Sequence, residues 1–181
     1  YDEKILIYKE QLSSINKIYM DSEFEQKKIY ESEIKKKITS YKSQDVKKDR
    51  YESDKFIDFD NVVEKLVISK LKCKYCNKEI VILTNKYRDN DQWTLERINN
   101  DIGHNTDNVI ISCLECNLKR RNSNMDNFEY TKKLSKDSAF VLVGIQVSPN
   151  NSIEYIIENM TINNFKYQKL TENDLCYELL V

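Results

Sequence analysis

Apolar side chains recur every three or four positions between residues 4 and 42, the spacing that places them on one face of an α-helix. A weaker stretch near Asp21–Gln26 predicts a break in this helix. We therefore expect a long amphipathic helix that buries its apolar stripe against the rest of the chain or against a protein partner. Residues 43–53 are polar and predict a connector. The stripe consists of Ile5, Tyr8, Leu12, Ile15, Tyr19, Ile34, Ile38 and Tyr41.

The middle of the chain alternates short apolar runs with polar stretches. Val and Leu at helical spacing predict a helix that begins near Asp58 or Asp60, because either carboxylate can cap a first turn. Later runs rich in β-branched residues are typical of strands, and a stretch without periodicity predicts a loop. Strand, loop, strand and helix is the order that a compact ββα unit needs. The predicted elements are a helix over 60–71, strands over 79–84, 93–98 and 109–112, a loop over 99–108 and a helix over 114–122.

A different pattern begins at residue 138. The segment A-F-V-L-V-G-I-Q-V predicts a strand, S-I-E-Y-I-I-E-N-M a helix, and F-K-Y-Q-K-L and L-C-Y-E-L-L two further strands. This βαββ order predicts a small C-terminal subdomain. The sequence as a whole predicts an α+β protein with a helical N-terminal arm over 1–53, a central domain over 54–136 and the βαββ subdomain over 137–181.

Charge is balanced over the whole chain but not along it. The 29 Lys and Arg side chains nearly match the 30 Asp and Glu, for a net charge of −1. By segment, the net charge is −2 over 1–64, +5 over 65–136 and −4 over 137–181. A basic middle between acidic flanks favours contact with a polyanion such as nucleic acid. No apolar run reaches the roughly 18 residues of a membrane helix, so we expect no membrane partner.

Composition narrows the chemistry. Two glycines in 181 residues, with neither G-x-x-x-x-G-K-[ST] nor G-x-G-x-x-G, argue against a glycine-rich phosphate loop. The single histidine removes His-rich metal sites and any His–His acid/base pair. Abundant Lys, Ile, Asn and Tyr indicate an AT-rich genome of origin rather than a function. Chemistry on phosphate groups would therefore come from a bound metal and cationic side chains.

Four of the five cysteines form two C-x-x-C pairs, Cys73 with Cys76 and Cys113 with Cys116, with 36 residues between the pairs. Each C-x-x-C turn points two thiolates at one centre, and two turns complete the tetrahedral sulfur shell that zinc prefers. Disulfides would need an oxidising compartment that nothing in the sequence indicates, and a redox C-x-x-C would explain only one pair. We therefore expect a structural Zn²⁺ in a reducing, intracellular setting, with catalysis elsewhere because the shell is closed. The fifth cysteine, Cys176, is expected to be a small buried hydrophobe.

The segment that follows the first pair contains W-T-L-E-R-I-N-N-D-I-G-H-N-T-D-N-V-I-I and then C-L-E-C-N-L-K-R-R-N. Over residues 60–125, the order C-x-x-C, acidic residue, G-x-x-x-x-N-hydrophobic and C-x-x-C-N-x-x-K resembles the four-cysteine form of the HNH (ββα-metal) endonuclease family. The resemblance implies a ββα-metal core held by the zinc. It also implies DNA or another nucleic acid as partner, and phosphodiester hydrolysis with Mg²⁺ or Mn²⁺.

The resemblance assigns candidate ligands to that catalytic metal. Glu96 takes the place of the family's metal-binding carboxylate, Asn117 that of the second ligand, and Asn108 that of the Asn that braces the hairpin loop. Carboxylate and amide oxygens suit a hard cation on a scissile phosphate. Without the resemblance, Glu96 could be a strand carboxylate paired with Lys or Arg, and Asn117 could bond near the helix start.

At the general base the sequence departs from the family. Arg97 stands where most members have His, and a guanidinium cannot accept a proton from water. His104, the only histidine, follows seven residues later in the predicted loop, and its ordinary pKa of about 6.5 suits a base. His104 could equally be a surface residue. The alternatives are that a metal-bound water loses its proton to solvent, or that the site is inactive.

Three cations lie near the end of the helix predicted over 114–122. They are candidates to hold a nucleic-acid backbone, or else they form a solvated helix end. They are Lys119, Arg120 and Arg121. If the site is inactive, the same core could be a zinc-stabilised structural subunit of a larger assembly, such as a ribonucleoprotein or virion. Such a subunit would dock on partners through the N-terminal helix and the C-terminal subdomain.

The C-terminal subdomain carries a second, weaker resemblance. The segments F-V-L-V-G-I-Q-V and F-K-Y-Q-K-L-T-E-N-D-L-C-Y-E-L-L resemble the end of the ACT-like regulatory domain of threonine dehydratases. The resemblance supports a small βαββ fold and implies no ligand.

Overall fold

The amphipathic N-terminal stripe forms two α-helices, α1 (Tyr8–Tyr19) and α2 (Lys27–Lys47), after a short 3₁₀ turn over Glu3–Leu6. The break between α1 and α2 falls at the polar stretch where the sequence predicts it, and Asp21 has a left-handed backbone there (φ 50°). The connector predicted over 43–53 is wrong at its start, because α2 extends into it. Its polar residues continue the helix, and one of them faces the interior.

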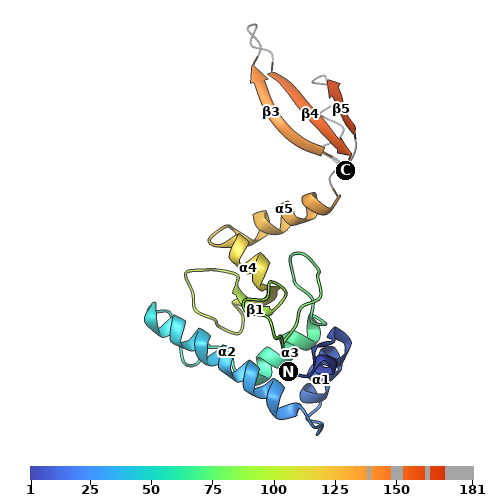
Figure 1. Cartoon of the computed structure of the whole chain (residues 1–181). Coiled ribbons are helices and arrows are strands. Elements are labelled where there is room, and N and C mark those ends of the chain that lie inside the picture. Colours follow the sequence, from blue (N-terminus) through green and yellow to red (C-terminus); the bar gives the residue numbers. More distant parts are fainter. Residues whose placement is uncertain (138–139, 148–152, 162–163, 170–181) are drawn as a thin grey trace. The chain divides into compact units, whose positions relative to one another are not determined.

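Two compact units make up the chain, residues 1–132 and 133–181, and each is described by itself (Figure 1). Helix α5 (Met125–Asp137) continues across this boundary in the sequence. No helix in the part of the chain that the structure describes is long and apolar enough to cross a membrane. The structure, a computed structural model, describes residues 1–137, 140–147, 153–161 and 164–169.

A helix, a two-stranded sheet and a second helix follow the N-terminal pair. Helix α3 (Phe59–Ile68) begins at Asp58, whose side chain caps it by accepting a hydrogen bond from the backbone N–H of Asn61. The antiparallel strands β1 (Trp93–Arg97) and β2 (Val109–Cys113) pair with each other. Helix α4 (Leu114–Arg120) starts directly after β2. The predicted order of strand, loop, strand and helix is therefore confirmed.

The segment over 79–84 does not form the strand that its apolar residues predict. It has only isolated bridges to other segments. Its backbone bonds instead to a buried side chain of α1: Gln11 Oε1 accepts from the N–H groups of Ile82 (2.7 Å) and Leu83 (2.8 Å), and Gln11 Nε2 donates to Leu83 O (3.0 Å). One amide side chain thus takes the place of a neighbouring strand.

A continuous core joins the N-terminal helices to the cysteine-bearing segment. Ile15 of α1, Ile34 of α2, Leu66 of α3 and Trp93 of β1 are fully buried members of it. Full burial of a large aliphatic side chain stabilises a fold by about 1.5–3 kcal/mol. The core therefore holds β1 and α2 in one unit, and residues of both elements line the cavity described below (Figure 1).

The C-terminal unit contains a three-stranded antiparallel sheet in the order β3-β4-β5. Its strands are β3 (Phe140–Val147), β4 (Ile153–Thr161) and β5 (Asn164–Lys169). The helix predicted for S-I-E-Y-I-I-E-N-M, and with it the βαββ order, is wrong, because this segment forms β4. Three Ile and one Tyr within five residues favour an extended backbone over a helix. The last predicted strand, L-C-Y-E-L-L, lies outside the described residues.

Candidate functional site

The four cysteines of the two C-x-x-C pairs come together, with all sulfur atoms within 4.8 Å of one another. None of the four forms a disulfide. The sulfurs of Cys76 and Cys113 are 3.8 Å apart, which is the edge of about 3.8 Å expected for a tetrahedron with metal–sulfur bonds of about 2.3 Å. The cluster could therefore hold one metal ion such as zinc.

The backbone supports this cluster from both sides. The N–H of Lys74, inside the first pair, donates to Ile111 O of β2 (3.0 Å) and so ties the first turn to the second. The N–H of Cys116 points at the sulfur of Cys113 (3.4 Å), which caps α4. Hydrogen bonds from the thiols of Cys113 and Cys116 lower the pKa of the Cys73 thiol and favour the thiolate that a metal requires.

Beside the cluster, a cavity of about 480 Å³ is lined by residues that the sequence predicts to hold a catalytic metal or to act as the general base. Glu96 comes from β1, His104 from the loop between the strands, and Asn117 from α4, and all three line this cavity. Arg97 and Arg121 also line it. The structure therefore brings together two candidate ligands, the candidate base and two cations.

Asn108 braces the loop between β1 and β2. Its Nδ2 donates to the carbonyl oxygens of Asn99 and Gly103 (both 2.9 Å), and its Oδ1 accepts from the N–H of Asn99 (2.9 Å). These bonds tie the start of the loop to its middle. Asn108 acts on the cavity only through the loop, since it does not line the cavity.

Glu96 and Arg120 form a buried ion pair; their side chains are 4% and 2% exposed. Arg120 Nη1 donates to Glu96 Oε1 and to Arg97 O (2.7 Å), and Nη2 donates to Ile98 O (2.8 Å). Arg120 is thus an interior counter-ion, away from the solvent-facing position that a phosphate contact needs. Of the other two predicted cations, Lys119 is exposed and pairs with Glu115 (2.6 Å) and Arg121 reaches the cavity.

The donor atoms of Glu96 and Asn117 fit a hard divalent cation. Glu96 Oε2 is buried and has no hydrogen-bond partner among the described residues. Asn117 donates through Nδ2 to Thr94 Oγ1 (3.3 Å), and its Oδ1 stays available as a ligand. Mg²⁺ commonly takes one or two protein oxygens and keeps several waters. Burial raises the pKa of the Glu96 carboxyl to about 7, although Arg120 opposes the shift.

His104 is held by a carboxylate that we did not predict. Asp45, near the end of α2, accepts a hydrogen bond from the backbone N–H of His104 (2.6 Å). Its two carboxylate oxygens also lie 2.9 and 3.0 Å from the ring nitrogen Nδ1 of His104. The Tyr41 ring packs on the imidazole with centroids 4.5 Å apart. Burial lowers the pKa of His104, and Asp45 partly opposes this. His104 is therefore a buried, oriented imidazole rather than a surface residue.

Gly103 allows the loop to approach α2 closely. A Cβ built on Gly103 would lie 2.3 Å from Arg50 O and 2.9 Å from Asp45 Oδ2. Backbone oxygen cannot move aside as the end of a flexible side chain can, so this position requires glycine.

We expect Gly103→Ala to destabilise the protein by at least about 1–3 kcal/mol, as for other forced overlaps in packed regions. Thermal or urea unfolding followed by circular dichroism measures this. The matched control is Ile102→Ala, because the Ile102 side chain is 39% exposed. This change should alter the free energy of unfolding by no more than about 0.5 kcal/mol. Equal stability of Gly103→Ala and the unmutated protein would show that the loop is not packed against α2 in this way.

One family model matches part of the chain. The C-terminal regulatory domain of threonine dehydratase matches residues 117–180, which is less than half of the chain. The resemblance noted in the C-terminal sequence is confirmed to this extent, and the match begins further toward the N-terminus, within α4. Glu96 and His104 lie outside it. No curated protein and no solved structure matches the chain.

Proposed function

We propose that the protein is an HNH-type, metal-dependent endonuclease that binds DNA and hydrolyses its phosphodiester bonds. One observation carries the proposal. Glu96, Asn117 and His104, which the HNH resemblance and the histidine count single out from the sequence, line a single cavity with two cations. The three residues come from β1, from the loop that follows it and from α4.

The side chains divide the chemistry among them. A Mg²⁺ or Mn²⁺ held by Glu96 Oε2 and Asn117 Oδ1 would supply Lewis-acid stabilisation of charge on the phosphate. Because Nδ1 of His104 faces Asp45, Nε2 is the ring nitrogen left to accept a proton from water. Asp45 fixes the imidazole's orientation and keeps the proton on Nδ1. Arg97 stays cationic and serves with Arg121 to attract the phosphodiester.

In this proposal the four-cysteine cluster holds a structural zinc. Four thiolates close the tetrahedral shell, so the zinc has no position for substrate. It ties the turn after α3 to the end of β2 and the start of α4, and α4 carries Asn117. Zinc would thereby fix one wall of the cavity.

A second candidate function is that of a zinc-stabilised structural subunit in a larger assembly, such as a ribonucleoprotein or virion. The buried ion pair favours it, because Arg120 already neutralises Glu96. Arg97 in the position of the family's base adds to this. In such a subunit the cavity would need neither a metal nor a base.

Asn117→Ala separates the two candidates. For an endonuclease, cleavage of duplex, branched or single-stranded DNA with Mg²⁺ or Mn²⁺ should fall by more than about 10²-fold, because even an outer-shell change costs 10–100-fold. Stability should hardly change, since the side chain makes one long hydrogen bond. Glu96→Ala is the poorer variant, because it would leave Arg120 buried without its counter-ion.

The matched control is Asn16→Ala, an exposed position on α1. It should cleave at the unmutated rate. If the unmutated protein cleaves none of the three DNA forms with either metal, the structural candidate is the correct one.

A further inference from the structure

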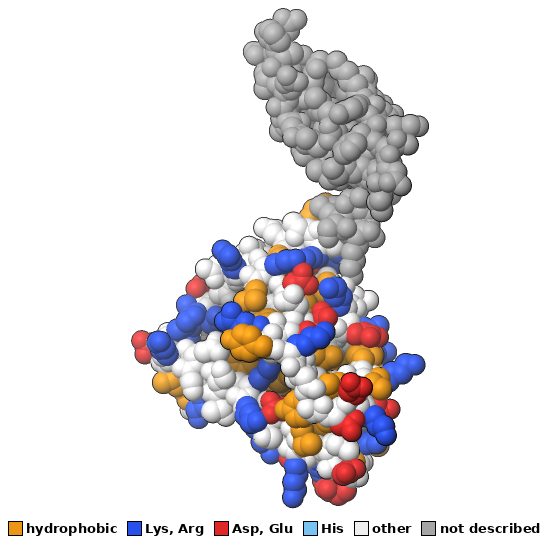
Figure 2. Space-filling model, in the orientation of Figure 1, with side chains coloured by type: hydrophobic (Ala, Val, Ile, Leu, Met, Phe, Trp, Pro, Cys, Tyr) orange, Lys and Arg blue, Asp and Glu red, His pale blue; other side chains and the backbone are white. Residues whose placement is uncertain are grey.

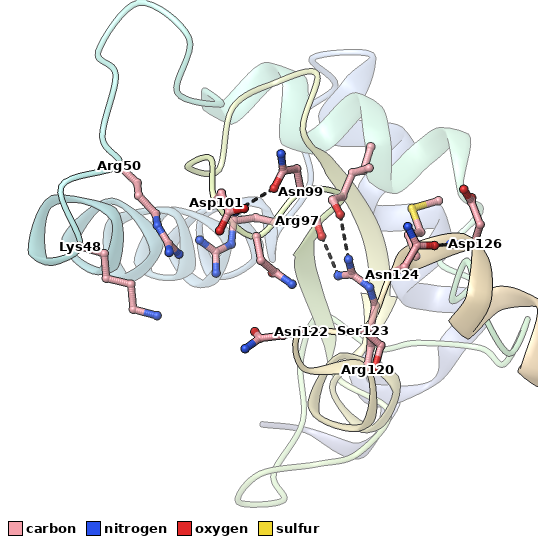
Figure 3. Close-up of a pocket in the computed structure, with 13 residues that line it drawn as sticks. Lys48, Arg50, Arg97, Asn99, Asp101, Arg120, Asn122, Ser123, Asn124 and Asp126 are labelled. Carbon is pink, nitrogen blue, oxygen red and sulfur yellow. Dashed lines mark hydrogen bonds between the residues drawn. The ribbon is translucent and has the colours of Figure 1, made fainter.

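A second cavity, of about 720 Å³, adjoins the one that holds Glu96 and His104. Both cavities are lined by Arg97, Asn100 and Asn122. Figure 3 shows Lys48 and Arg50, which follow the end of α2, beside Arg97 at the end of β1. Neither Lys48 nor Arg50 is among the residues that the sequence suggested.

Four cations line this second cavity: Lys48, Arg50, Arg97 and Arg120. Arg120 is paired with Glu96, whereas the other three have no ion-pair partner among the described side chains. Lys48 and Arg50 form no ion pair within residues 1–133, where side chains are described; the ion pairs there involve other residues. The guanidinium groups of Arg50 and Arg97 lie next to each other (Figure 3). Burial lowers the pKa of Arg97 and the repelling charge of Arg50 lowers it further, while the carboxylates of Asp45 and Glu96 oppose the shift. An anion between the two guanidinium groups would relieve this repulsion.

The acidic side chains near these cations are either hydrogen-bonded to another residue or exposed to solvent in the cavity lining. Asp45 is engaged by His104, while Asp101 and Asp126 line the cavity from exposed positions. On the face of the molecule that Figure 2 draws, Lys and Arg are interspersed with Asp and Glu. In the second cavity, by contrast, four cations line one hollow with two carboxylates.

The remaining lining is suited to sugar–phosphate backbone and not to bases. Amide and hydroxyl groups of Asn99, Asn100, Asn122, Ser123 and Asn124 surround the cations. Such neutral groups supply many of the phosphate and sugar contacts in nucleic-acid complexes. No aromatic side chain lines this cavity, so it lacks the stacking platform that base recognition on single strands uses.

We infer that the cavity lined by Lys48, Arg50 and Arg97 binds the phosphodiester backbone of a nucleic-acid strand that continues from the proposed catalytic cavity. The inference rests on the proposed function, which supplies the neighbouring catalytic cavity. Binding itself needs neither the metal nor His104. Contacts are made to phosphates, so affinity does not depend on base sequence.

The test is the salt dependence of DNA binding, measured by fluorescence anisotropy with a labelled duplex and no added divalent cation. Each phosphate contact on duplex DNA contributes about 0.9 to the slope of log affinity against log salt concentration. The double variant Lys48→Gln/Arg50→Gln should lower the slope by about 1.8. If the two proteins bind equally at 1 M salt, the double variant should bind about 60-fold more weakly than the unmutated protein at 0.1 M salt.

Lys28→Gln is the matched control. Lys28 is an exposed lysine near the start of α2, on the order of 30 Å from Lys48 at 1.5 Å per helical residue. Its slope should equal that of the unmutated protein. Unfolding midpoints of all variants confirm that they are folded, and Gln preserves much of each side-chain stem.

An unchanged slope in the double variant, or an equal drop in Lys28→Gln, would overturn the inference. Absence of DNA binding by the unmutated protein would also overturn it. The outcome is separate from that of the cleavage assay. A lowered slope in a protein that cuts no DNA would retain the binding site and reject the endonuclease, and cleavage with an unchanged slope would do the opposite.

Discussion

If the four-cysteine cluster holds the structural zinc proposed above, removal of that zinc is expected to unfold the first unit rather than loosen one turn. Structural zinc contributes about 10–16 kcal/mol to folding in small zinc-binding peptides, whereas a whole domain is stable by only about 5–15 kcal/mol. Cys73, Cys113 and Cys116 are members of the same core cluster as Leu71 and Trp93. Loss of the metal would leave mutually repelling thiolates, or bulkier protonated thiols, inside that core.

Metal analysis of the purified protein should find one zinc per chain. Addition of a strong chelator, or the change Cys113→Ser, should abolish the cooperative thermal transition seen by circular dichroism. Cys176→Ser is the matched control, because it removes a thiol that belongs to neither C-x-x-C pair, and it should keep the zinc. A metal-free protein with the same transition, or one with disulfides between these cysteines, would refute a structural zinc.

Replacement of His104 by Ala should slow DNA cleavage by about 10²–10⁴-fold, the usual contribution of a general base. DNA affinity should stay the same, because His104 is buried and its Nδ1 bonds to Asp45. Rates and affinities are measured on the same labelled duplex. Cleavage by His104→Ala at the unmutated rate would exclude His104 as the base.

The change Asp45→Asn tests the positioning role of the carboxylate. It should slow cleavage and also move the acid limb of the pH–rate profile to lower pH. The sign follows from the charge: Asp45 raises the pKa of His104 against the effect of burial. Without it the imidazole loses its proton at lower pH, and a base works in its neutral form.

Val46→Ala is the matched control for Asp45→Asn, since the Val46 side chain is 53% exposed on the same turn of α2. It should leave both the rate and the pH profile unchanged. A purely structural role for Asp45 would lower the rate without moving the acid limb.

The sequence predicts the elements of the cavity well, because they depend on local patterns. The break between α1 and α2, the cap at Asp58 and the order of β1, β2 and α4 all follow from apolar spacing and capping residues. The two C-x-x-C pairs similarly predict that their four sulfur atoms lie close together, because a shared metal site would require it. The prediction fails at three places. Polar residues from 43 onward continue α2, the segment 79–84 bonds to the distant Gln11 side chain, and the segment of β4 contains residues that are typical of strands.

The residues that we did not predict are those whose partners lie far away in the sequence. Asp45 meets His104 across 59 residues, and nothing in its polar neighbourhood marks it as buried. Arg120 did carry a local signal: it stands four residues after Cys116, which places both on the same buried face of α4. Helical phase therefore distinguishes Arg120 from Lys119 and Arg121.

The Gln11 side chain has a consequence for how this chain can be divided. Its hydrogen bonds to Ile82 and Leu83 span 71 and 72 residues. Cutting away the N-terminal helices would strip those buried backbone groups of their partner and also remove Asp45 from His104. The segment with the motif that resembles HNH nucleases is therefore not expected to fold without α1 and α2. Transfer of this segment to another protein would have to include these two helices.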